Sequence, residues 1–251
     1  MSHMKKNILS LVFLVLSGFF IFTCAKKKEQ PLTQDPAYRS ELVFSENFNG
    51  DLNNWYVGGK GKAEITGDSA LILQLGSESN DLVLWSTRDF SGNFQIEYKI
   101  RFPDSSGFHA VFFCTKGAEG ENILQMNPPP LEDFEQYIEK SLAGYQISCH
   151  MYDSVNRHLS TSRVRRNPGN LLLANAGSDP CTDNRDYVID VMKIDNRIQY
   201  YVDGALVHDL RDRAGFGPTY YSGKIGFSIH GLAGVFNVLL DGIRVYKLIP
   251  R

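Results

Sequence analysis

A strict two-residue alternation is the feature that most constrains this chain. Between residues 94 and 102 the apolar positions alternate with polar or charged ones. The apolar set is Phe94, Ile96, Tyr98, Ile100 and Phe102, and the polar set is Gln95, Glu97, Lys99 and Arg101. Because successive side chains of a β-strand point to opposite faces, this pattern predicts a strand with one buried face and one solvated face.

Similar short segments recur along the chain. The candidate strands span 42–48, 63–67, 70–75, 82–87, 108–115, 144–151, 160–166, 187–194, 197–203, 223–229 and 235–247. A tight turn at 202–205 indicates a hairpin. About a dozen strands at this spacing predict an all-β fold, a jelly-roll sandwich of two antiparallel sheets. One helical stretch is expected over residues 131–141, as an insertion that follows three prolines.

The N-terminus has the composition of an export signal. Lys5 and Lys6 precede an apolar run over residues 8–22, which is short against the roughly 20 residues of a membrane span. The run ends at Cys24, in a context similar to a bacterial lipobox, whose cysteine becomes the lipidated first residue. An uncleaved anchor is the alternative. We therefore predict a lipoprotein anchored in the bacterial cell envelope, with the outer membrane favoured.

The same segment sets the predicted domain organisation. Residues 1–24 are the signal peptide, the polar and proline-containing residues 25–40 form a tether, and residues 41–251 form a single β-sandwich domain. Residues 1–28 hold five of the 26 Lys and Arg and no acid, which leaves 21 basic against 28 acidic residues in the rest. The excess of acidic residues after residue 28 argues against a surface that binds nucleic acid.

Three cysteines follow the predicted signal. An odd number in an exported protein leaves at least one unpaired. Cys114 ends an apolar run and is expected to be a buried thiol, and Cys149 with Cys181 is the candidate disulfide. No cysteine or histidine spacing indicates a zinc site, so we expect no metal, and we expect no cofactor.

The order of motifs resembles a known family. Phe48-Asn49-Gly50 with Trp55 opens the domain, and the segments 223–227 and 236–246 close it. The segments between them are 82–85, 112–114, 117–122, 144–148, 165–169 and 176–180. Together they resemble the YesU-like family of the concanavalin A-like lectin/glucanase superfamily, over about residues 42–248. The resemblance implies a curved two-sheet sandwich and a carbohydrate ligand, because members of that family tend to accompany polysaccharide-degrading systems.

The chain departs from that family at two positions. Relatives usually carry histidine where Gln146 stands, and a second histidine where this chain has Leu171. If those histidines are an acid/base pair in the relatives, this chain lacks both, and His230 is the candidate to replace them. Glu121, in a glycine-rich loop after a strand, is the second catalytic candidate, with a solvated loop carboxylate as its alternative.

Several residues are candidates for contact with a sugar. They are Trp85, Tyr145, Gln146, Arg163, Arg165 and Asp179. Aromatic faces suit stacking on sugar rings, but Trp85 and Tyr145 fit the apolar core as well. Arg163 and Arg165 point to the same face of a strand, where they can bind a uronate carboxylate or form a plain charged face. Asp179 precedes proline and can simply shape a turn.

Known catalytic signatures of this fold are missing from the sequence. No strand carries the paired carboxylates of retaining glucanases, and the Gln-Ile-His strand of alginate lyases is absent. We therefore predict a surface lipoprotein that binds or processes oligosaccharides or polysaccharides, with acidic plant or algal glycans favoured. The alternatives are a glycoside hydrolase, or a polysaccharide or 3-keto-glycoside lyase, of the same fold, and a structural lipoprotein without a ligand. The expected partners are a glycan and, through the lipid, a membrane, and the oligomeric state stays open.

Overall fold

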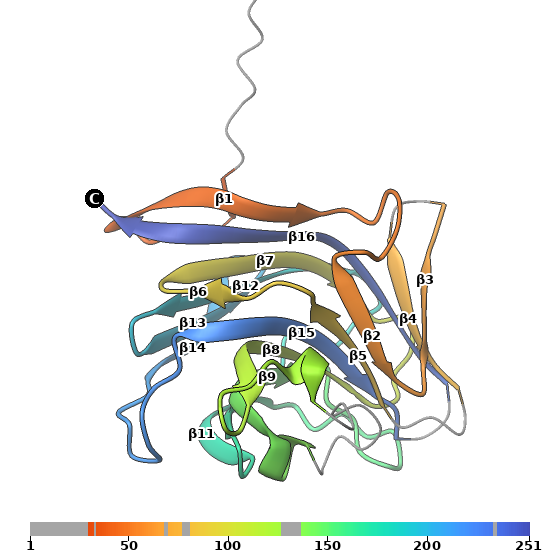
Figure 1. Ribbon diagram of the computed structural model, residues 1–251. Coiled ribbons are helices and arrows are strands. Elements are labelled where there is room, and N and C mark those ends of the chain that lie inside the picture. Colours follow the sequence, from red (N-terminus) through yellow and green to blue (C-terminus); the bar gives the residue numbers. More distant parts are fainter. Residues whose placement is uncertain (1–29, 33, 68–69, 77–80, 127–136, 233–234) are drawn as a thin grey trace, which may run out of the picture.

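The structure is a computed structural model that describes residues 30–32, 34–67, 70–76, 81–126, 137–232 and 235–251. Its strands form two eight-stranded antiparallel sheets, here called sheet A and sheet B. The predicted all-β sandwich of two antiparallel sheets is confirmed. Figure 1 shows β1 beside β16 along one edge, and β8 and β9 beneath β15.

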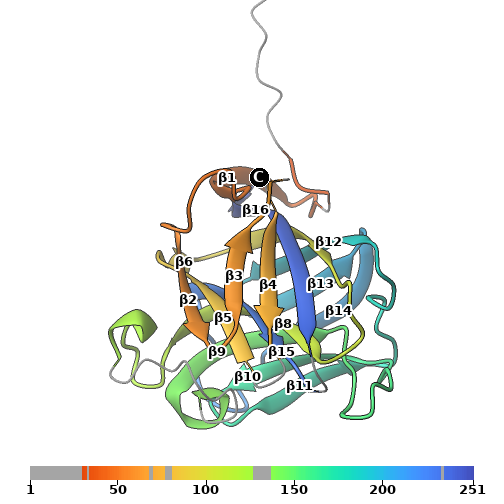
Figure 2. The same cartoon turned by 90° about the vertical axis from the view of Figure 1, so that its right-hand side faces the viewer.

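Sheet A runs in the order β14, β13, β12, β7, β16, β4, β3, with β1 paired to β16. Its strands are β14 (Ala205–Arg211), β13 (Arg197–Val202), β12 (Asp186–Ile194), β7 (Phe94–Arg101), β16 (Phe236–Pro250), β4 (Leu71–Leu75), β3 (Lys62–Ile65) and β1 (Tyr38–Glu46). Figure 2 shows β3, β4 and β16 next to one another at one end of the sandwich. Asp203 and Gly204 join β13 to β14, and both have positive φ, as the predicted two-residue hairpin turn requires.

Sheet B runs in the order β11, β10, β9, β8, β15, β5, β2, with β6 paired to β15. Its strands are β11 (Leu171–Ala176), β10 (Ser162–Asn167), β9 (Leu142–Cys149), β8 (Phe108–Gly117), β15 (Ser222–His230), β5 (Asp81–Ser86), β2 (Trp55–Gly59) and β6 (Phe90–Ser91). The strands β2, β6 and β11 of this sheet, and β14 of sheet A, fall outside the predicted ranges. Most neighbours in this sheet are distant in sequence, so the sheet gathers side chains from across the whole chain.

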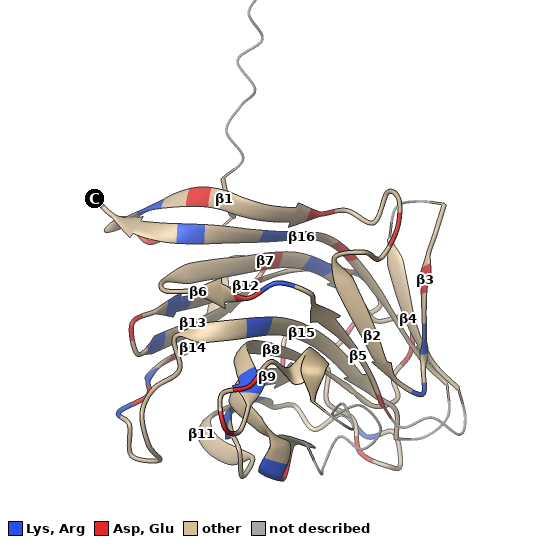
Figure 3. Cartoon of the chain, in the orientation of Figure 1, with Lys and Arg blue, Asp and Glu red and all other residues tan. Residues whose placement is uncertain are grey.

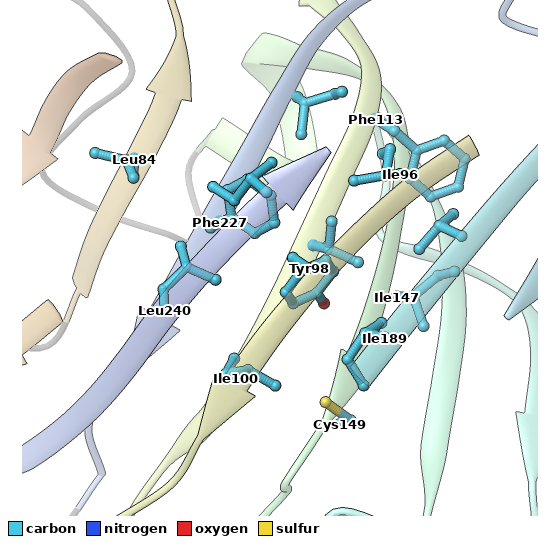
Figure 4. Close-up of a cluster of buried hydrophobic side chains, with 14 of the residues drawn as sticks. Leu84, Ile96, Tyr98, Ile100, Phe113, Ile147, Cys149, Ile189, Phe227 and Leu240 are labelled. Atoms are coloured by element: carbon cyan, nitrogen blue, oxygen red, sulfur yellow. The ribbon is translucent and has the colours of Figure 1, made fainter. Parts of the chain in front are cut away.

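The core lies between the inner faces of the two sheets. The apolar face predicted at 94–102 is confirmed, because Phe94, Ile96, Tyr98, Ile100 and Phe102 are all buried in the core. The opposite face is only partly solvated, since Gln95 and Glu97 are buried as well. Figure 4 shows Ile96, Tyr98 and Ile100 of β7 against Phe113, Ile147 and Phe227 of sheet B. Cys114 is buried, as expected. Cys149 and Cys181 are buried but free, so the candidate disulfide between them is not formed.

A second, smaller apolar cluster lies on the outer face of sheet B. Val83, Trp85, Ala110 and Phe112 point to this face and are covered by Ile123, Ile138 and Leu142. Ile123 belongs to a 3₁₀ turn, η1 (Ile123–Gln125), and Ile138 to a π-helical turn, η2 (Tyr137–Ser141). The helix expected over 131–141 is described only at η2, because 131–136 lie outside the described residues. The insertion between β8 and β9 therefore covers one half of this face.

Described residues just before β1 already contact sheet A. β1 begins at Tyr38, Pro31 is buried, and the backbone N–H of Leu32 donates to Glu97 Oε2 at 2.6 Å. Glu97 lies on the outer face of sheet A, so Leu32 lies against that face. Among the described helices, none is long and apolar enough to cross a membrane.

Candidate functional site

Polar side chains gather on the half of sheet B that the insertion leaves uncovered. Strand alternation points Gln146 and Ser148 of β9 and Arg163 and Arg165 of β10 to this outer face. The register places Arg165 opposite Gln146 and Arg163 opposite Ser148. A cavity of about 180 Å³ opens here, lined by Phe108, Ile138, Gln146, Ser148, Met151, Arg163, Arg165, Asn170 and His230. We call it the sheet B cavity.

Two guanidinium groups give the sheet B cavity a positive wall. In the described part of the chain, no ion pair joins Arg163 or Arg165 to a carboxylate, although Arg165 Nη1 donates to the carbonyl oxygen of Asn170 at 2.5 Å. Burial and the neighbouring charge of Arg163 lower the pKa of Arg165 from its ordinary value. Two like charges held together in this way favour an anion between them.

Gln146 supplies a hydrogen-bond acceptor to the same cavity. Its side chain is almost fully buried, and Nε2 donates to Asn170 Oδ1 at 3.1 Å. Its carbonyl oxygen Oε1 is buried and has no hydrogen-bond partner among the described residues. An unpaired buried acceptor costs about 1–3 kcal/mol, so a hydroxyl or N–H of a ligand at this position would be favourable.

His230 closes the other side of the cavity. It is the last residue of β15, opposite Asp81 on β5 and Phe108 on β8. Its Nδ1 lies 2.5 Å from Asp81 Oδ1, and its ring centroid lies 4.9 Å from that of Phe108. The carboxylate and the aromatic ring together fix the orientation of the imidazole.

Trp85 is not available to a sugar in this structure, which corrects one prediction. The residue is fully buried in the second apolar cluster, and its ring lies over Gly226, where an added Cβ would come within 2.4 Å of it. The apolar run around Trp85 is visible in the sequence. That the insertion between β8 and β9 folds over this run is not.

Tyr145 is also a core residue and does not reach the cavity. It points inward from β9, and its hydroxyl donates to Asp212 Oδ2 at 2.6 Å and accepts from the backbone N–H of Tyr220 at 3.2 Å. Asp212 also pairs with the buried Arg166, whose guanidinium lies over the ring of Tyr220 at 4.3 Å. This network attaches the segment 212–220 to sheet B.

Glu121 and Asp179 do not line the cavity either. Glu121 is exposed, and its carbonyl oxygen accepts from Gly117 in the turn that follows β8. The Asp179 carboxylate accepts from the backbone N–H groups of Met151 and Cys181 at 3.1 and 3.0 Å and contacts His158. Asp179 therefore shapes its loop, as the alternative interpretation held.

A larger cavity, of about 480 Å³, lies on the outer face of sheet A. Its charged lining residues are Lys99, Arg101, Asp186 and Asp241, with Ile72 and Leu239 among the apolar ones. Arg101 is already paired with Asp186 at 2.7 Å, and none of the buried unpartnered polar atoms in the described residues lines this cavity. The sheet B cavity is therefore the stronger candidate, although it is smaller.

Four residues of the sheet B cavity were predicted from the sequence, and others were not. Gln146, Arg163, Arg165 and His230 were candidates, and the structure brings them together. Asp81 was missed, because its role depends on the pairing of β5 with β15. Asn170 was missed as well, since it acts through local contacts with Gln146 and Arg165. Within the described ranges, no group of three or more His, Cys, Asp or Glu could hold a metal ion.

Solved structures share the fold. A protein of unknown function with a galectin-like fold from Bacillus subtilis aligns with a TM-score of 0.77 at 18% identity, over 85% of this chain and 100% of its own. The carbohydrate binding module CBM66 from Bacillus subtilis aligns with a TM-score of 0.51 at 16% identity, over 77% and 96%. A β-glucanase from Bacillus licheniformis aligns with a TM-score of 0.55 at 13% identity, over 85% and 100%. These likenesses confirm the fold, while the narrower YesU-like resemblance stays a prediction.

Sequence comparison gives the family. No curated protein matches the sequence. A family model described as a domain of unknown function, DUF1961, matches residues 41–237. The chain belongs to this family.

Proposed function

We propose that this DUF1961 domain binds oligosaccharides in the sheet B cavity, with acidic sugar units preferred. The observation that carries the proposal is the pair Arg163 and Arg165, which face the cavity without a carboxylate partner in the described residues. Each can donate to a sugar carboxylate, and Arg165 can do so through the fork of its guanidinium.

The other lining residues suit a sugar as well. The partnerless Oε1 of Gln146 can accept a hydrogen bond from a sugar hydroxyl, and Phe108 offers an apolar surface. A cavity of about 180 Å³ corresponds to roughly six waters at ~30 Å³ each, which is room for one sugar unit. A longer glycan would therefore place one acidic unit in the cavity.

The comparisons support the ligand class by analogy of fold. A carbohydrate binding module and a β-glucanase share this sandwich at low identity. A shared fold does not fix a function, so the proposal rests on the cavity and not on those neighbours.

Glycan binding by residues 30–251 tests the proposal. An array of pectic, algal and neutral polysaccharides should give binding to uronate-containing glycans, and added salt should weaken it. Arg165→Ala should lower the affinity about ten- to a hundredfold, since a charge-assisted hydrogen bond contributes about 1.5–3 kcal/mol. Arg39→Ala, at an exposed position on β1, is the matched control and should bind like the wild type. Absence of binding to every glycan, or equal affinity of Arg165→Ala and wild type, would refute the proposal.

We also propose that Cys24 carries the lipid anchor predicted from the sequence; this residue lies outside the described residues. A multiply acylated cysteine holds a protein firmly at a membrane, whereas one chain alone holds it weakly. Cys24→Ala should move the full chain from the membrane fraction to the soluble fraction. If the variant still pellets with membranes after a salt wash, the lipid anchor is excluded.

A further inference from the structure

We propose that Asp81 and His230 form a proton-transfer pair, and that the sheet B cavity cleaves acidic glycans by β-elimination. This inference rests on the proposed function, because the uronate must first bind beside Arg163 and Arg165. It adds a reaction and a catalytic residue, His230, that binding alone does not need.

The geometry of the pair is that of an oriented histidine. Asp81 is buried and its Oδ1 lies 2.5 Å from His230 Nδ1, while the imidazole itself lines the cavity. A carboxylate on one ring nitrogen fixes the tautomer and directs proton exchange to the other nitrogen, Nε2. Because the two residues are opposite each other in the β5–β15 ladder, the backbone fixes their spacing.

The described lining residues fit an elimination reaction. A histidine opposite two guanidinium groups suits removal of a proton next to a carboxylate, since cations bound to that carboxylate stabilise the negative charge that develops.

The step is balanced without a further reactant. His230 Nε2 takes the proton from the ring carbon that carries the carboxylate. The electrons of that C–H bond form a carbon–carbon double bond with the neighbouring carbon, and the glycosidic C–O bond on that neighbour breaks. The leaving oxygen takes a proton, which the protonated His230 returns. The products are a shortened glycan with a free hydroxyl and an unsaturated uronate, and no oxidant, reductant or water is consumed.

The roles of the other residues follow from their places. Arg163 and Arg165 neutralise the carboxylate, and Gln146 orients the sugar through its carbonyl oxygen. Asp81 is a positioning residue, because it acts through His230. Substitution of Arg163 or Arg165 should therefore weaken glycan binding. Substitution of His230 or Asp81 should lower the turnover rate and leave binding unchanged.

The test uses residues 30–251 and the glycans that this protein binds. Formation of the unsaturated product is followed by its ultraviolet absorbance, and the affinity of the protein for each glycan is measured in parallel. Wild type should form product. His230→Ala should bind normally but lose about a hundredfold or more of the rate, and added imidazole should restore part of it. Asp81→Asn should lower kcat by about tenfold or more at unchanged KM. His158→Ala, outside the cavity, should resemble wild type in both assays.

The outcomes separate the two proposals. Glycans that bind wild type but yield no unsaturated product would overturn the elimination reaction and leave the binding function intact. Absence of binding would remove both. Product formation by His230→Ala at the wild-type rate would overturn the role of His230. Because a histidine that only supports the fold would not respond to imidazole, rescue also distinguishes catalysis from a folding defect, which circular dichroism of each variant checks directly.

Discussion

The hydroxyl of Tyr145 adds a hydrogen bond to the carboxylate of a buried ion pair. It donates to Asp212, which is also paired with Arg166, and both charged side chains are almost completely buried. A buried charge left without one of its partners is strongly destabilising. Tyr145 therefore stabilises the fold, although the sequence made it a candidate for stacking on a sugar ring.

Tyr145→Phe separates these roles. The variant keeps the ring in the core but removes a hydrogen bond to a charged group, which contributes about 1.5–3 kcal/mol. We expect the free energy of unfolding in urea to fall by about that amount while glycan affinity stays at the wild-type value. If the variant has unchanged stability but weaker glycan affinity, Tyr145 contributes to glycan binding and not to stability.

His109 predicts a pH dependence of stability. Its Nδ1 lies 2.9 Å from the carbonyl oxygen of Ser228, which can only accept, so Nε2 is the nitrogen that accepts from the hydroxyl of Tyr98. Burial lowers the pKa of His109 to about 3. Since the unfolded chain takes up this proton near pH 6.5, the contribution of His109 to stability is complete above that pH and is lost as the pH falls towards the folded value.

Urea unfolding across pH measures this effect. Between about pH 6 and pH 4, His109 should make the free energy of unfolding fall by up to about 1.4 kcal/mol per pH unit. His109→Gln should have a shallower slope, although it is less stable at pH 7. His150 and His208, whose pKa values burial also lowers, keep some slope in both proteins. Parallel curves for wild type and variant would contradict the assignment.

At the scale of elements, the β13–β14 hairpin shows how one turn fixes the register of two strands. The chain reverses through Asp203 and Gly204, whose φ values are 50° and 78°, between the paired residues Val202 and Ala205. Left-handed backbone costs glycine little and a residue with a Cβ more. Gly204→Ala should therefore lower the free energy of unfolding by about 1 kcal/mol.

Space does not limit that substitution, because a Cβ on Gly204 would only reach Leu32 at 4.0 Å. Gly177→Ala is the control, since Gly177 also has open space but no positive φ. Equal unfolding midpoints for the two variants would show that the turn conformation does not limit stability.

Elements also show what the sequence could and could not predict. Period-two alternation is local, so it identified β7 and placed Arg163 and Arg165 on one face of β10. The burial of Trp85 depends on Ile123 and Ile138 of the insertion and on Leu142 at the start of β9. The Asp81–His230 pair joins residues 149 positions apart. Such contacts depend on strand order, which alternation within one strand does not contain.

At the scale of the whole molecule, the two outer faces of the sandwich carry different features. The sheet B cavity opens on one outer face, and Leu32 is bonded to Glu97 on the other. Residues of both charge signs are spread over the strands (Figure 3). With an anchor at Cys24, the chain would therefore reach the domain on the side opposite the cavity.

Truncation tests whether the segment before β1 belongs to the fold. A chain that starts at Tyr38 loses the burial of Pro31 and the hydrogen bond from Leu32 to the buried Glu97, which also pairs with Arg244 at 3.1 Å. Compared with a chain that starts at Gln30, its free energy of unfolding should be lower by at least about 1.5–3 kcal/mol, the contribution of a hydrogen bond to a charged group. Its glycan affinity should be unchanged, because the cavity lies on the other sheet. If the two chains unfold at the same urea concentration, residues 30–37 are a tether after all; if the shorter chain loses affinity, the two faces are coupled through the core.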